Sequence, residues 1–500
     1  MARSTRSRRL TAGALTAALL AAAAGSATVA APAALGGGWQ VGGWQATLSG
    51  VASTTMADVA RAVGASATGL DGTGVGVALI DTGVAPVPAL PGARVVNGPD
   101  LSLESQSADL RYLDSFGHGT HMAGIIAGAD SSIGFQGLAP GVKLTSVKVA
   151  TANGAVDVTQ VIAAIDWVVK HRNDDPNNPI RVLNLSYGTP GNAPSYLDPL
   201  TFAVENAWNH GIVVVIAGGN GGSTTGLSNP GYDPFVLSVG SSTPDGKALS
   251  AFTNTSNTRT VDWSVRSIDV AAPGEGIVSL RDPGSNVDTL FPIARVGDSL
   301  FRGSGTSQAT AVVSGAVALL LQKRPSLGPD QVKALLKASA IPLTSGVGAT
   351  QHIGVVNVAN ALKRSALDGF QSWTDGSGVG SLDGSRGGVT VVKDTYALKG
   401  ENSLFGTFNA PIWANEAAYE TSWKGGVWMG WRVAGDGWTG TSWASKTWAS
   451  ATWAGGAWDG SGTWTDSSWS GHYWSGDSWS GHYWSGHYWS SDGWATAAWG

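Results

Sequence analysis

Cysteine is absent from the 500 residues of this chain. Its absence excludes disulfide bonds, thiolate nucleophiles, iron–sulfur clusters and cysteine-ligated zinc sites. Charged side chains make up only 13% of the chain, and acidic residues outnumber basic ones by 35 to 30. This balance argues against nucleic acid as a partner, because nucleic-acid-binding proteins usually carry a basic face. Any covalent catalysis must therefore use Ser, Thr, Lys, His, Tyr or a carboxylate.

Long hydrophobic runs are equally scarce, and the one nearest the N-terminus is Leu10–Ala24, which is uncharged and rich in Ala and Leu. This run is shorter than the ~20 residues that a membrane span needs. Four arginines precede it and small residues follow it, which is typical of a secretory signal peptide over residues 1–31. Its removal would change the net charge from −5 to −9 and leave no membrane span. We therefore expect a protein that is secreted, and either released or associated with the cell surface, with a short leader over residues 32–54.

The middle of the chain alternates short apolar runs with helical patterns. The runs predict buried strands at Val75–Ile80, Leu144–Ala150, Arg181–Leu185 and Ile212–Ala217. The helical patterns predict helices at Val158–Arg172, Pro199–His210, Thr306–Lys323 and Gln331–Ala338. Continuous apolar strands that alternate with helices indicate an α/β fold, a mainly parallel sheet covered by helices on both faces.

Four short motifs lie at the predicted strand ends and helix starts. They are Asp81-Thr82-Gly83, His118-Gly119-Thr120-His121, the Asn220 that ends Gly218-Gly219-Asn220, and Ser307 in Gly305-Thr306-Ser307-Gln308-Ala309. A nucleophilic serine needs a base to take its proton, and the base needs a carboxylate to hold its tautomer. It also needs donors for the developing oxyanion, which a helix N-terminus and an asparagine amide provide.

Each motif has another interpretation when it is taken alone. Asp81-Thr82-Gly83 also fits an aspartic protease, but that mechanism requires a second such tripeptide, and the chain has none. His118 and His121 have a spacing that could ligate a metal, yet no acidic or cysteine ligand accompanies them. The Gly-x-Ser-x-Gly pattern of α/β-hydrolases is not met around Ser307. The order Asp, His, Ser is the subtilisin order among the known triads.

Taken together, these motifs make residues 55–364 resemble a subtilisin-family (subtilase) serine protease domain. The resemblance implies a three-layer α/β/α sandwich in which Asp81 orients the imidazole, His118 is the general base and Ser307 is the nucleophile. It also implies that Asn220 donates to the oxyanion. It further implies substrate contacts from Leu185, Ser186, Tyr187, Gly188, Gly218 and Gly219.

The chain departs from the family pattern at three places. Gln308 follows the nucleophile where the family usually has Met, and Ala311 replaces the family's proline. Because a thioether beside the nucleophile can be oxidised, Gln308 predicts tolerance to peroxide. Too little chain precedes residue 55 for the family's folding prodomain. The chemistry requires no cofactor, and structural calcium, common in the family, has no acidic loop here that we can identify as its site.

The end of the chain is rich in tryptophan. Residues 365–412 form a predicted Gly/Ser-rich linker, and residues 413–500 form a predicted module in which 17 of the 23 tryptophans lie. From Trp438 they recur every five residues, with one inserted residue before Trp464. A repeat of this kind could form a β-solenoid that packs on itself, bind cell-wall glycan through exposed indoles, or stay disordered until bound.

The motifs favour a secreted serine endopeptidase that cleaves protein or peptide substrates through an Asp-His-Ser triad and an acyl-enzyme intermediate. The alternative is a cell-wall or glycan-binding surface protein whose protease domain is inactive or incidental.

Overall fold

The computed structural model describes residues 53–106, 110–191, 193–255, 258–259, 265–388, 391–393, 396–424 and 427–432. The predicted signal peptide, nearly all of the predicted leader, and the regular Trp repeat from residue 438 lie outside the described residues.

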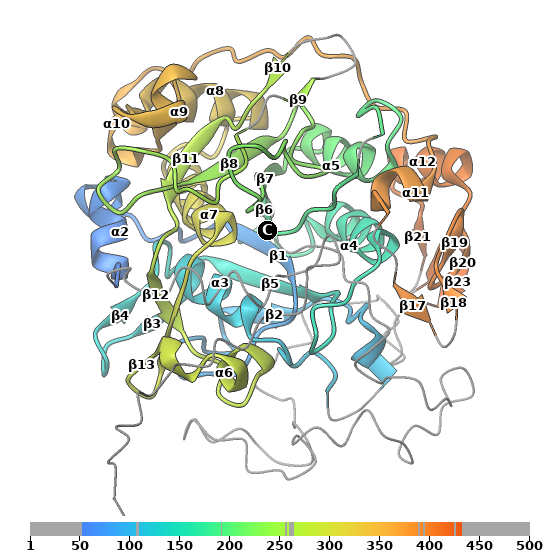
Figure 1. Ribbon diagram of the computed structural model, residues 1–500, viewed down its shortest axis with the longest axis horizontal. Coiled ribbons are helices and arrows are strands. Elements are labelled where there is room, and N and C mark those ends of the chain that lie inside the picture. Colours follow the sequence, from blue (N-terminus) through green and yellow to red (C-terminus); the bar gives the residue numbers. More distant parts are fainter. Residues whose placement is uncertain are drawn as a thin grey trace, which may run out of the picture. The chain divides into compact units, whose positions relative to one another are not determined.

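A nine-stranded sheet forms the centre of the described residues (Figure 1). Every neighbouring pair in it runs parallel except the edge pair β15–β16. The strands in sheet order are β15 (Ile341–Pro342), β16 (Gly354–Val355), β11 (Val270–Pro273), β8 (Leu237–Ser242), β7 (Val213–Ala217), β6 (Ile180–Leu185), β1 (Gly76–Asp81), β5 (Lys143–Lys148) and β2 (Val95–Asn97). A mainly parallel sheet in an α/β fold is thereby confirmed.

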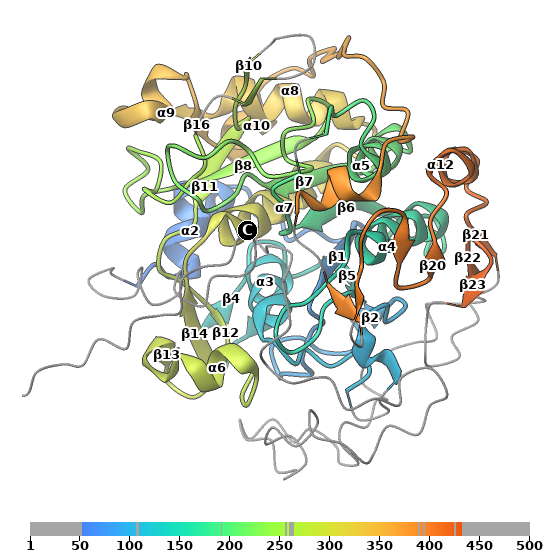
Figure 2. The same ribbon diagram turned by 45° about the vertical axis from the view of Figure 1, so that its right-hand side comes forward.

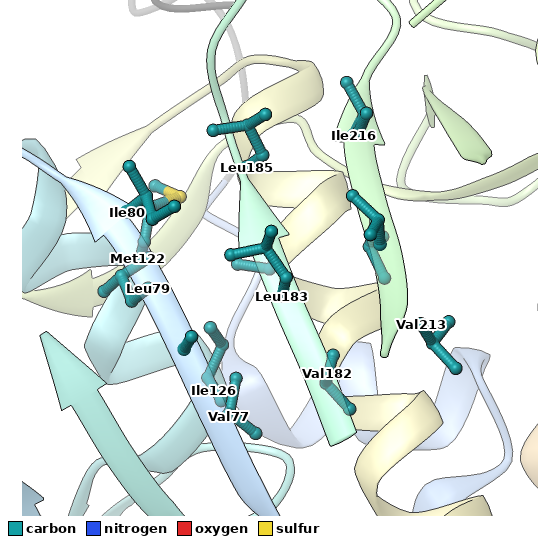
Figure 3. Packing of buried hydrophobic residues seen from close by; sticks show 14 of the residues in the cluster. Val77, Leu79, Ile80, Met122, Ile126, Val182, Leu183, Leu185, Val213 and Ile216 are labelled. Atoms are coloured by element: carbon teal, nitrogen blue, oxygen red, sulfur yellow. The ribbon is translucent and has the colours of Figure 1, made fainter. Parts of the chain in front are cut away.

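The central strands are buried on both faces because their side chains are almost all apolar. Every residue of β1 and of β7 is buried, as expected for parallel strands covered by helices. Figure 3 shows Met122 of a neighbouring helix beside Ile80 of β1, and Ile126 of the same helix beside Val77. The packing of these side chains fixes that helix against the strand, and both elements carry predicted site residues.

Two pairs of helices flank the sheet (Figures 1 and 2). One pair is α3 (His118–Ala127) and α7 (Thr306–Lys323), which pack against each other, and the other is α4 (Val158–His171) and α5 (Pro199–Asn209). Asp157 caps α4 by accepting from the Thr159 amide, as its position in the sequence suggests. α7 is buried over nearly all its length, which explains why it lacks charge until its last turn.

Smaller elements surround this framework. The remaining helices are α2 (Met56–Ala62), η1 (Ala65–Ala67), η2 (Leu103–Gln106), α6 (Asn286–Leu290), η3 (Pro292–Ala294), α8 (Pro329–Ser339), α9 (Gly346–Thr350), α10 (Val358–Lys363), α11 (Leu382–Arg386) and α12 (Ala410–Ala418). The remaining strands are β3 (Ala129–Asp130), β4 (Phe135–Gln136), β9 (Thr258–Arg259), β10 (Val265–Arg266), β12 (Ile277–Leu280), β13 (Arg295–Val296), β14 (Leu300–Gly303), β17 (Val392–Lys393), β18 (Tyr396–Ala397), β19 (Asn402–Ser403), β20 (Gly406–Thr407), β21 (Trp423–Lys424), β22 (Val427–Trp428) and β23 (Trp431–Arg432).

The C-terminal part of the described chain packs onto α4 and α5 (Figure 1). The indoles of Trp413 and Trp428 are buried and donate to the same oxygen of Asp166 on α4, at 2.8 and 2.9 Å. Burial raises the pKa of Asp166 to about 6. The predicted boundary between linker and repeat module at 412/413 thus lies inside α12. Trp413 and Trp428, which the prediction placed in the repeat module, belong to the hydrophobic core.

Candidate active site

The order of the strands brings the predicted site residues to one edge of the sheet. β1 lies between β5 and β6, so the chain passes from β5 on one side of β1 to β6 on the other, and the strand order reverses beside β1. In such sheets, ligands bind beyond the carboxyl ends of the strands at the point where the order reverses. Asp81 is the last residue of β1, Leu185 is the last residue of β6, and Asn220 follows the end of β7 by three residues.

Asp81 and His118 form a buried pair. The Asp81 Oδ1 atom lies 2.7 Å from His118 Nδ1 and also accepts from the Thr82 amide at 2.7 Å. Both side chains are buried. Since a carboxylate only accepts, His118 Nδ1 carries the proton in this contact, and Nε2 is the ring nitrogen that does not contact Asp81.

A second carboxylate, Asp114, ties the loop after β1 to the start of α3. It accepts from the Thr82 hydroxyl, from the Gly117 amide, and from both the amide and the hydroxyl of Thr120, each at 2.7 Å. Burial raises its pKa. The Thr82 hydroxyl in turn accepts from the Gly119 amide at 2.9 Å. This network sets the register between Asp81 and His118, and the sequence reasoning did not find it.

Ser307 is the second residue of α7 and is fully buried. α7 packs against α3, which begins at His118. The Ser307 hydroxyl has no hydrogen-bond partner among the described residues. Bonds between a nucleophile and its base are often long without substrate and shorten in the complex. The pairing of Ser307 with His118 therefore belongs to the proposal below.

The amide of Asn220 is held in one orientation by the residue that precedes Ser307. The Thr306 amide and hydroxyl both donate to Asn220 Oδ1, at 2.9 and 3.0 Å. Because Oδ1 is fixed, the donor Nδ2 is directed away from Thr306, and a Cβ placed on Gly305 would lie 3.3 Å from it. The motif Gly305-Thr306-Ser307 thus contains a positioning residue, Thr306, that the sequence reasoning did not single out.

The predicted substrate-contacting residues flank these groups. The Ser186 hydroxyl donates to the Ser307 carbonyl at 3.3 Å, and the Gly219 amide donates to the Thr306 hydroxyl at 3.2 Å. The Leu185 and Tyr187 side chains are buried, so these two residues can offer only backbone groups to a peptide. Gly218 and Gly188 have no space for a Cβ, which would lie 2.9 Å from Ile268 and 2.6 Å from Ser228 respectively.

Metal ligation finds no support in the part of the chain that the structure describes. No group of three or more His, Asp or Glu side chains there is arranged to hold a metal ion. His121, the second histidine of its motif, is buried, and burial followed by the charge of His118 lowers its pKa to about 3. The described helices also include none that is long and apolar enough to cross a membrane.

An acid–imidazole pair, a serine at a helix N-terminus and an oriented amide are the components of a serine hydrolase. A match to the Subtilase family covers residues 72–383. The chain belongs to this family, for which an Asp-His-Ser triad is typical, and its catalytic domain is a subtilisin-like serine endopeptidase.

The chain is also similar to individual proteins and to solved structures. The chain is 38% identical over 277 residues to the serine protease AprX of Bacillus subtilis, across 53% of this chain and 60% of AprX. It is 34% identical over 276 residues to subtilisin Savinase of Lederbergia lenta, across 55% of this chain and 86% of that protein. Among solved structures, a protease from Pseudoalteromonas arctica is 27% identical with a TM-score of 0.48, across 60% of this chain and 91% of that one.

Proposed function

We propose that this chain is a secreted endopeptidase in which Ser307 is the nucleophile, His118 the general base and Asp81 the carboxylate that orients the base. The buried Asp81–His118 contact of 2.7 Å carries the proposal, because it leaves Nε2 of the imidazole as the group that accepts a proton. His118 would take the proton of the Ser307 hydroxyl as this oxygen bonds to the scissile carbonyl carbon. The same imidazolium would then give that proton to the leaving amine.

The oxyanion would be bound by Asn220 Nδ2 and by the Ser307 amide at the start of α7. Donors fixed in place before the reaction stabilise charge at little reorganisation cost, and one such donor contributes ~2.7–4 kcal/mol. Thr306 supplies this preorganisation for Asn220. Water would hydrolyse the acyl-enzyme by the same steps in reverse, with His118 again acting as base.

Hydrolysis of casein tests this proposal. We expect a sulfonyl fluoride to block it and Ser307→Ala to abolish it. Casein hydrolysis that persists in Ser307→Ala would overturn the assignment of the nucleophile, and a wild-type protein without any hydrolytic activity would favour a binding role.

Export, and glycan binding as one of the alternatives for the tryptophan repeat, concern residues outside the described ranges. N-terminal sequencing of the secreted product, with and without Ser307→Ala, separates removal of residues 1–31 by export from self-cleavage further along the chain. Glycan binding by the repeats would appear as retention of the Ser307→Ala protein on purified cell walls. A chain that ends at residue 432 would then be released, and equal retention of both chains would contradict this role.

A further inference from the structure

The segment around α11 contacts the turn that follows residues 185–188, the proposed substrate-binding segment after β6. The Thr189 hydroxyl donates to the carbonyl oxygen of Ser385, and the Gly191 amide donates to the Thr189 hydroxyl at 3.2 Å. Gly387 lies so close to Pro190 that a Cβ at position 387 would overlap its carbonyl group. Residues 385–387, here named the strap, thus cover residues 189–191.

The strap also contacts the loop on the other side of this turn. Thr189 and Asn229 exchange two backbone hydrogen bonds of 2.9 Å, which form an antiparallel bridge. The Asn229 side-chain amide donates to Asp198 at 2.9 Å and to the Ser385 carbonyl at 3.3 Å. The Ser385 hydroxyl donates to the other oxygen of Asp198 at 2.8 Å. The turn is therefore held between Asn229 and the strap, and Asp198 links the two.

Arg386 anchors the strap to the body of the fold. Its guanidinium is almost fully buried and contacts Asp157, the N-cap of α4, at 2.8 Å. It also donates to the carbonyls of Gly400 and Asn402, at 2.8 and 2.7 Å. An arginine in a buried ion pair whose other N–H groups also find acceptors holds its backbone segment in place more effectively than an arginine in a surface pair does. The anchor is 229 residues away from Asp157 in sequence, so no local pattern predicts it.

We propose that the strap holds segment 185–188, which follows β6, in the conformation that binds an extended peptide, so that the C-terminal segment is a positioning element for long substrates. This inference rests on the function proposed above. A peptide that pairs with an extended segment binds through backbone N–H and C=O groups, and these bonds form only when the segment holds those groups at the matching distances. Displacement by even ~1 Å can cost about a hundredfold in rate. A substrate of a single residue offers this segment fewer backbone groups than an extended peptide does, so it reports mainly on the chemistry.

Two neighbouring glycines provide a matched pair of variants. Gly387 and Gly388 both have positive φ, +64° and +87°, so alanine at either carries a similar backbone cost. A Cβ at position 387 would collide with Pro190, whereas a Cβ at position 388 would meet nothing within 4 Å. Gly387→Ala must therefore displace the strap or the turn, and Gly388→Ala leaves both in place.

The measurement is kcat/KM for a blocked tetrapeptide p-nitroanilide and for a blocked single-residue ester, with active sites counted by a sulfonyl fluoride. We expect Gly387→Ala to lower the tetrapeptide value about tenfold or more while the ester value changes less than about twofold. Gly388→Ala should keep both values. If Gly387→Ala does not fold, Thr189→Val, which replaces the hydroxyl by a methyl group, should also lower the ratio of the tetrapeptide kcat/KM to the ester kcat/KM.

The strap proposal alone would be overturned if kcat/KM fell equally on both substrates, or if Gly387→Ala and Thr189→Val left the ratio of the tetrapeptide kcat/KM to the ester kcat/KM unchanged. Wild-type protein that cleaves neither substrate would instead overturn the proposed function, so the two failures are distinguishable.

Discussion

Thr306→Val tests whether the orientation of the Asn220 amide contributes to catalysis. The substitution keeps the shape of the side chain and the Thr306 amide contact, but it removes the hydroxyl that donates to Asn220 Oδ1 at 3.0 Å and that accepts from the Gly219 amide at 3.2 Å. One neutral hydrogen bond contributes ~1 kcal/mol, which corresponds to about fivefold in rate. Complete loss of the donor would cost ~2.7–4 kcal/mol. We therefore expect kcat to fall about fivefold in Thr306→Val and about a hundredfold or more in Asn220→Leu.

The assay separates binding from chemistry. The oxyanion forms only on the way to the transition state, so kcat should fall while KM stays nearly constant. Thr310→Val is the matched control, because Thr310 is a buried threonine on the same helix whose hydroxyl donates to the Thr306 carbonyl at 2.8 Å. If Thr306→Val and Thr310→Val had the same kcat, the proposed role of Thr306 would be refuted.

Three further predictions follow from the site and its surroundings. Asp81→Asn should lower kcat by about four orders of magnitude with KM preserved, because an amide stabilises the wrong tautomer of His118; a loss of less than about tenfold would contradict this role. Burial raises the pKa of Asp166 to about 6, above 3.8, so its stabilising contribution is full below about pH 4 and is lost as pH rises through 6. The thermal stability of Asp166→Asn relative to wild type should therefore increase between pH 4 and pH 8, by up to ~3 kcal/mol, and a constant difference would exclude this effect. Activity should survive mild peroxide, and Gln308→Met should become sensitive to it; a wild-type protein that peroxide inactivates would contradict the prediction.

The main helices and strands could be predicted from the sequence because each depends on the pattern of apolar residues within its own segment. The helix predicted at Thr306–Lys323 has those limits in the structure, since a long uncharged run can only be a buried helix here. The strand predicted at Val75–Ile80 is shifted by one residue to Gly76–Asp81, which places Asp81 at the end of β1. The motifs around Asp81, His118, Asn220 and Ser307 mark element ends, which is where parallel α/β sheets collect reactive groups.

The contacts that orient these groups could not be predicted in the same way. Of the four hydrogen bonds that Asp114 accepts, the one from the Thr82 hydroxyl forms only when the start of α3 packs beside the end of β1. The Arg386–Asp157 pair and the two indoles on Asp166 join segments more than 200 residues apart. Neither a Gly/Ser-rich composition nor the spacing of tryptophans indicates which helix such a segment will pack against. The C-terminal segment therefore appeared to be a linker from its composition, although it packs against the catalytic fold.

The most direct test of the account is the site at which a sulfonyl fluoride reacts, mapped by peptide mass spectrometry on wild-type protein. We expect one modification per chain, on the peptide that contains Ser307, at a rate that falls sharply in Asp81→Asn. Full inactivation with the label on another residue, or a labelling rate that Asp81→Asn leaves unchanged, would contradict it.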